Sequence, residues 1–153
     1  MKISENTKES LVLATLSKAI SYKEYRDLVA AHAAAETSTG DTQSEALSEY
    51  TQLNNARMRR LDKTLKPAEA VLERFQNFES KQTWLVLSES WCGDAAQNLP
   101  VINKIALENS NINLQLVLRD DNEELMDLFL TNGGKSIPKL IALDSENNVI
   151  DIN

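Results

Sequence analysis

The chain of 153 residues contains a single cysteine, Cys92, and a single histidine, His32. One cysteine excludes an internal disulfide and any zinc cage built from several cysteines. His32 has no second histidine or cysteine near it in the sequence, so we expect it to pack or to lie in solvent. We therefore expect no metal and no other cofactor. An unpaired thiol also suits a reducing compartment, which favours a cytoplasmic protein.

Long hydrophobic runs and an excess of positive charge are also absent. The longest apolar run is far shorter than the roughly 20 residues that span a bilayer, so we expect no membrane partner. The chain carries 16 basic and 23 acidic residues, a net charge of −7. Because affinity for nucleic acid depends on clustered lysine and arginine, a nucleic-acid partner is not expected. Aromatic residues make up only 5%, but 42% apolar and 25% charged residues are typical of a globular protein.

The charge is unevenly distributed along the chain, which indicates two regions. Residues 1–66 carry ten basic and nine acidic side chains, a net of +1, whereas residues 67–153 carry six and fourteen, a net of −8. The length suits one compact domain with an appendage. We place a boundary near Lys66, between a helical N-terminal extension and the second region.

Apolar residues recur every three or four positions in the N-terminal half, which predicts helices. The pattern covers residues 10–35, as one helix or a broken pair, and then residues 47–65 and 67–80. Residues 36–44 are rich in serine and threonine and contain no apolar side chain. We expect a mobile loop there.

After residue 80 the hydrophobic period changes. Residues 83–87 form a continuous apolar run of strand length, which is typical of a strand buried on both faces of a sheet. The segments that follow are a helix over 95–109, a strand over 114–118, a helix over 123–130, a strand over 139–143 and a weaker strand over 148–152. This alternation predicts an α/β fold with crossover connections.

The only thiol lies where the first predicted strand is followed by a helix, in the segment Trp91-Cys92-Gly93-Asp94-Ala95. At the start of a helix, free backbone N–H groups and the positive end of the dipole favour the thiolate, which lowers a cysteine pKa. The negative charge of Asp94 opposes this effect. The alternative interpretation of Cys92 is a small buried hydrophobic residue.

Three linked features resemble the thioredoxin superfamily. Trp91-Cys92-Gly93 begins the helix, Pro100 follows eight residues after Cys92, and Ser136-Ile137-Pro138 precedes a strand, with Pro138 lying 46 positions after Cys92. The resemblance covers about residues 67–153 and is nearest to bacterial thioredoxin-like proteins with a helical N-terminal extension. It implies a three-layer, thioredoxin-like α/β fold with a cis peptide bond before Pro138.

The resemblance also implies a substrate cleft between Cys92 and Pro138. Cys92 would be the nucleophile, and the backbone of Ile137 and Pro138 would pair with an extended substrate. The other residues implied to line the cleft are Trp91, Gly93 and Asp94. The implied partner is a protein or a low-molecular-weight thiol or disulfide, and the oligomeric state stays open. We expect the nearby Glu89 to be a solvated carboxylate at the strand end.

The sequence departs from the family at two positions that matter for redox chemistry. Ala95 replaces the second cysteine, which resolves the mixed disulfide, and Val86 replaces a buried carboxylate. Two functions stay open. The first is an enzyme, a monothiol thiol-disulfide oxidoreductase in which an external thiol resolves the adduct on Cys92, and it predicts a Cys92 pKa below that of a free thiol. The second is a redox-inactive module that binds proteins or peptides.

Thioredoxin-like domains usually continue into a C-terminal helix that covers one face of the sheet, and this chain stops at Asn153 without that helix. Either the sequence is a fragment, or the N-terminal helices or a partner molecule cover the exposed face. We expect the N-terminal helices to cover it. The side chains expected to pack there are Leu47, Tyr50, Met58 and Leu61.

Overall fold

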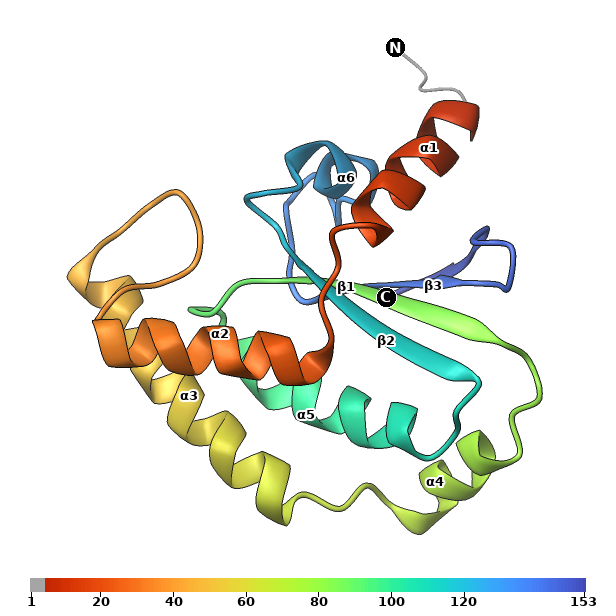
Figure 1. The fold of residues 1–153 in the computed structure, drawn as a ribbon, viewed down its shortest axis with the longest axis horizontal. Coiled ribbons are helices and arrows are strands. Elements are labelled where there is room, and N and C mark those ends of the chain that lie inside the picture. The colour runs from red at the N-terminus through yellow and green to blue at the C-terminus, as the bar shows by residue number, and fades with distance from the viewer. Residues whose placement is uncertain (1–4) are drawn as a thin grey trace.

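The computed structural model describes residues 5–153 as helices on both sides of a four-stranded sheet (Figure 1). The helices before the first strand are α1 (Glu5–Leu16), α2 (Tyr22–Ala35), α3 (Glu45–Thr64) and α4 (Glu69–Gln76). The elements that follow are β1 (Gln82–Ser88), α5 (Gly93–Leu107), β2 (Ile112–Leu118), α6 (Glu123–Leu128), β3 (Lys139–Leu143) and β4 (Val149–Ile152). Every helix and strand predicted from the hydrophobic period is present, and the predicted helical region 10–35 is divided between α1 and α2.

Capping residues set where the helices before the sheet begin. Ser21 caps α2: its side chain accepts a hydrogen bond from the Glu24 N–H, and the Glu24 carboxylate accepts one from the Ser21 N–H. Ser44 caps α3 by accepting from the Leu47 N–H. Because each cap fixes the first residue of its helix, it also fixes which side chains form the inner face.

The sheet has the strand order β2-β1-β3-β4, with β1 parallel to β2 and antiparallel to β3. The central strand β1 is buried on both faces. Trp84 and Val86 point into one core, and Leu85 and Leu87 point into the other. This position explains why the strand is a continuous apolar run rather than an alternating one.

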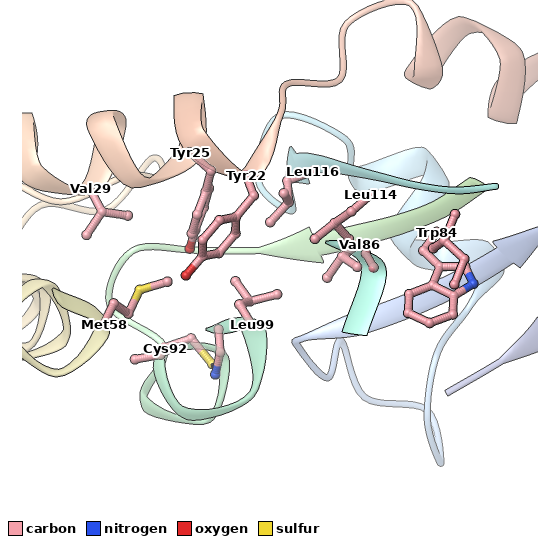
Figure 2. Close-up of a cluster of buried hydrophobic side chains, with 14 of the residues drawn as sticks. Tyr22, Tyr25, Val29, Met58, Trp84, Val86, Cys92, Leu99, Leu114 and Leu116 are labelled. Atoms are coloured by element: carbon pink, nitrogen blue, oxygen red, sulfur yellow. The ribbon is translucent and has the colours of Figure 1, made fainter. Parts of the chain in front are cut away.

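Helices cover both faces of the sheet, which gives the predicted three layers (Figure 1). On one face α2 and α5 pack on the strands, and α3 packs against both of these helices. The core of this face includes Tyr25, Val29, Met58, Val86, Leu99, Leu114 and Leu116 (Figure 2). On the other face α1 and α6 contribute Val12, Leu125 and Met126 to a second core.

The cover predicted from the N-terminal helices is present in part. Met58 is buried and Leu47 and Leu61 are half-buried, but Tyr50 is 55% exposed, so the prediction for Tyr50 was wrong. Near β3 and β4 the same side of the sheet has a groove of about 820 Å³. Its lining is mostly apolar and includes Phe75, Trp84, Ile102, Leu140 and Ile150.

Candidate functional site

Cys92 is the N-cap residue of α5. Its backbone is extended, and its sulfur accepts a hydrogen bond from the Ala95 N–H at 3.4 Å, the bond that serine or aspartate makes at other helix starts. Strand β1 ends four residues earlier, at Ser88. The sequence of strand, short turn and helix therefore places the thiol at the positive end of the α5 dipole.

The segment before β3 lies directly beside this sulfur. The Ile137–Pro138 peptide bond is cis. The Cys92 thiol donates a hydrogen bond to the carbonyl oxygen of Ile137, with 3.5 Å between sulfur and oxygen. Because β3 runs antiparallel to β1 and pairs Lys139 with Leu87, it brings the residues that precede it to the end of β1. The two segments that the sequence motifs single out are thus in contact.

Cys92 is buried, with 9% of the residue exposed. Burial raises the pKa of the Cys92 thiol above its ordinary value, and the Asp94 carboxylate acts in the same direction. The backbone N–H groups of Ala95 and Asp94 and the charge of Arg119 offset this rise only in part. The direction is opposite to the low pKa expected from the helix start, because desolvation of a thiolate outweighs the helix N-terminus here.

Three of the predicted cleft residues lie on the groove beside β3 and β4. Asp94 is exposed in the first turn of α5, and it lines this groove together with Ile137 and Pro138. The groove therefore begins at the segment that contacts the Cys92 sulfur.

Trp91 and Gly93 lie against other parts of the chain. The Arg119 guanidinium carbon lies 5.1 Å from the centroid of the half-buried Trp91 ring, a cation–π distance. Trp91 also borders residue 40, where a Cβ would lie 3.6 Å from the indole nitrogen. At Gly93 a Cβ would lie 3.8 Å from Nη1 of Arg57, which belongs to α3.

Glu89 is buried, with none of its surface exposed, so the prediction of a solvated carboxylate was wrong. Its carboxylate accepts hydrogen bonds from the Thr39 hydroxyl and from the Asp120 N–H, the latter at 3.0 Å. Burial raises the pKa of Glu89 above its ordinary value, and these two hydrogen bonds lower it. One carboxylate thus joins the ends of β1 and β2 to the loop between α2 and α3.

The next residue, Ser90, extends this buried network to α3. The Thr39 N–H donates to the Ser90 hydroxyl at 2.9 Å, and the Ser90 N–H donates to the Thr39 hydroxyl at 2.8 Å. Asn54 donates to the Ser90 carbonyl at 3.0 Å, and the hydroxyls of Thr51 and Ser90 lie 2.9 Å apart. The predicted loop over 36–44 is present, but through Thr39 it is docked on the site.

The sequence reasoning missed the contribution of α3 to this site. Leu47, Thr51, Asn54, Met58 and Leu61 follow one another at spacings of four and three, so they share one helix face. A signal was available, because Thr51 and Asn54 are polar residues within an otherwise apolar stripe. Polar side chains at core positions need hydrogen-bond partners, and here the partner is Ser90.

Two negative findings apply to residues 5–153. Among the side chains that the structure describes, no group of three or more histidine, cysteine, aspartate or glutamate residues is arranged to hold a metal ion. No helix in this range combines the length and the apolar character needed to cross a membrane.

The mixed sheet, the helices on both faces and a cysteine at the start of α5 opposite Ile137 define a thioredoxin-like protein. The sequence matches a family model described as thioredoxin over residues 40–152, which is more than half of the chain. The chain belongs to this family. The match begins in the loop before α3, and the boundary predicted near Lys66 stays a prediction.

Two solved structures share the fold. One is a crystal structure of PA1234, a protein of unknown function from Pseudomonas aeruginosa, with 24% identity and a TM-score of 0.58; the likeness covers 66% of this chain and 63% of that chain. The other is an HIV epitope scaffold of the 4E10 series, with 24% identity and a TM-score of 0.54, covering 88% of this chain and 76% of that chain. The chain thus spans less than two thirds of PA1234, and at this identity the likeness concerns the fold alone. A comparison with curated proteins found no match.

Proposed function

We propose that this protein is a monothiol thiol-disulfide oxidoreductase with Cys92 as its nucleophile. The observation that carries the proposal is the position of the Cys92 sulfur, at the start of α5 and 3.5 Å from the Ile137 carbonyl oxygen. The Cys92 thiolate attacks one sulfur of a substrate disulfide. The bond between the two substrate sulfurs breaks, a disulfide between Cys92 and the substrate forms, and the other sulfur leaves as a thiolate that takes a proton from water.

The second half of the cycle needs a thiol from solution, because Ala95 occupies the position of the resolving cysteine. A low-molecular-weight thiolate attacks the substrate sulfur of the mixed disulfide. That attack releases Cys92 as a thiolate and leaves the external thiol joined to the substrate by a new disulfide. A reducing compartment such as the cytoplasm supplies such thiols and is the location we propose.

The substrate lies against the Ile137–Pro138 segment in this proposal. In the free protein the Cys92 thiol donates a hydrogen bond to the Ile137 carbonyl oxygen. Deprotonation of the thiol removes this donor and frees the carbonyl to accept a hydrogen bond from a backbone N–H of an extended substrate. In this proposal Asp94 contributes to the site from the groove, and Trp91 and Gly93 flank Cys92 along the chain. The Trp91-Cys92-Gly93-Asp94 motif with its helical extension supports kinship with bacterial single-cysteine proteins of this family.

One observation favours the second candidate, a redox-inactive module that binds proteins or peptides. Cys92 is 9% exposed and burial raises its pKa, so at neutral pH the thiol is protonated and slow to react. This candidate predicts that Cys92→Ser binds a partner as well as the wild type does.

Turnover of a glutathione mixed disulfide, with glutathione as the external thiol, separates the two candidates. For the oxidoreductase we expect saturable turnover in the wild type and only the uncatalysed rate in Cys92→Ser. We expect Cys92→Ser to fold, because serine at the N-cap retains a hydrogen-bond acceptor. Circular dichroism of both proteins checks this. Equal rates in the two proteins would rule out Cys92 as the nucleophile.

A further inference from the structure

Arg57 of α3 lies beside Gly93, the residue that follows the proposed nucleophile, although it precedes Cys92 by 35 residues in the sequence. Its Nη1 atom lies 3.8 Å from the position that a Cβ of Gly93 would take. Asn54, three residues before Arg57, and Met58, the residue after it, are both buried, and Asn54 donates a hydrogen bond to the Ser90 carbonyl. Helix α3 therefore holds the half-buried Arg57 against the residue that directly follows Cys92.

The charge of Arg57 is available to a ligand. Arg119 forms an ion pair with Asp120 at 3.1 Å, and Arg26 forms one with Asp62 at 3.0 Å. Across the part of the chain that the structure describes, no carboxylate oxygen lies within 4.0 Å of the Arg57 guanidinium. An arginine whose guanidinium has no carboxylate partner is suited to hold the carboxylate of a ligand through two hydrogen bonds.

Asp94 carries the opposite charge one residue after Gly93, and it is exposed. The two side chains therefore act in opposite senses on a charged substrate: Arg57 attracts an anion and Asp94 repels it. The 9% exposure of Cys92 restricts the size of a group that can reach the sulfur, which favours a small disulfide over a folded protein.

We propose that Arg57 is a specificity residue that binds the carboxylate of a low-molecular-weight disulfide while Cys92 attacks the disulfide. This inference rests on the proposed function, because it assumes that Cys92 reacts with disulfides. It assigns to α3 a direct contact with the substrate, in addition to the hydrogen bonds that Thr51 and Asn54 make with Ser90.

The test compares two disulfides of similar length and opposite charge, dithiodipropionate and cystamine. Intact-protein mass spectrometry gives the rate at which each forms a mixed disulfide with Cys92. The ratio of the two rates, anionic over cationic, is the quantity to compare between variants, because the thiolate fraction of Cys92 cancels in it. A partly exposed ion pair changes the binding of a charged ligand by about threefold. Without the charge of Arg57, the anionic disulfide loses an attraction of this size and the cationic disulfide loses a repulsion of this size. Arg57→Gln should therefore lower the ratio about tenfold.

Three further variants act as controls. Arg57→Lys keeps the charge and should retain most of the ratio, and Asp94→Asn should raise it. Arg59→Gln removes the same charge from an exposed position of α3 and should leave the ratio unchanged. An unchanged ratio in Arg57→Gln, or an equal fall in Arg59→Gln, would overturn the inference about Arg57 and leave the proposed function standing. If neither disulfide reacts with wild-type Cys92, the proposed function fails as well.

Discussion

The docking of the loop between α2 and α3 predicts a large effect for one methyl-for-hydroxyl exchange, Thr39→Val. Valine keeps the shape of threonine but can neither donate to the Glu89 carboxylate nor accept from the Ser90 N–H, a bond of 2.8 Å in the wild type. A hydrogen bond to a charged group contributes about 1.5–3 kcal/mol, and an N–H left buried without a partner costs about 1–3 kcal/mol. Because the site can relax in part, we expect a loss of about 3 kcal/mol in the free energy of unfolding.

Urea unfolding followed by far-UV circular dichroism measures this loss. In a chain of this length a loss of about 3 kcal/mol lowers Tm by about 6–12 °C. Thr42→Val is the matched control, since Thr42 is exposed in the same loop. If Thr39→Val and Thr42→Val were equally stable to within about 0.5 kcal/mol, the Thr39 hydroxyl would not hold the loop on the site.

Two further predictions concern the same region. Gly40→Ala should destabilise by about 2 kcal/mol and Gly133→Ala by about 1 kcal/mol, measured by urea unfolding. Both residues have a positive φ, but only at Gly40 would a Cβ meet an atom, the Asp120 Oδ2 at 2.5 Å, and the ion pair with Arg119 holds that carboxylate in place. Equal losses would contradict the close approach. Burial raises the folded pKa of Glu89 above its ordinary value of 4.5, so the folded state binds this proton more tightly than the unfolded state does. Stability therefore falls as the pH rises from 4.5 through the folded pKa, and in Glu89→Gln this fall should be absent; parallel pH profiles of the two unfolding free energies would refute the assignment.

The elements of this fold could be predicted from the sequence because each carries its own local signal. The continuous apolar run of β1 and the three-to-four spacing in α3 arise from the surfaces that these elements bury. The proximity of Cys92 to the segment Ile137–Pro138 could also be predicted, because the two motifs and their spacing resemble those of a known family. Tyr50 was misassigned because it borders the apolar stripe of α3, and spacing alone does not show which edge of a stripe is covered.

The environment of the site could not be predicted in the same way, because it depends on contacts between distant segments. In the sequence Glu89 is an ordinary polar residue at the end of a strand. Its burial depends on the loop that carries Thr39, 50 residues earlier, whose hydroxyl donates a hydrogen bond to the Glu89 carboxylate. The position of Arg57 beside Gly93 depends on how α3 crosses the start of α5. The pKa of Cys92 shows the same limit: the helix start, which lowers it, is visible in the sequence, whereas the burial that raises it is not.

The reaction of native Cys92 with oxidised glutathione tests the central claim most directly. Intact-protein mass spectrometry across a pH series should show one glutathione per chain. Because burial raises the thiol pKa, the rate of adduct formation should still increase above pH 9.0, the ordinary thiol value. Adduct formation only in urea concentrations that unfold the protein would contradict the claim, because Cys92 would then be a buried core residue and not a nucleophile.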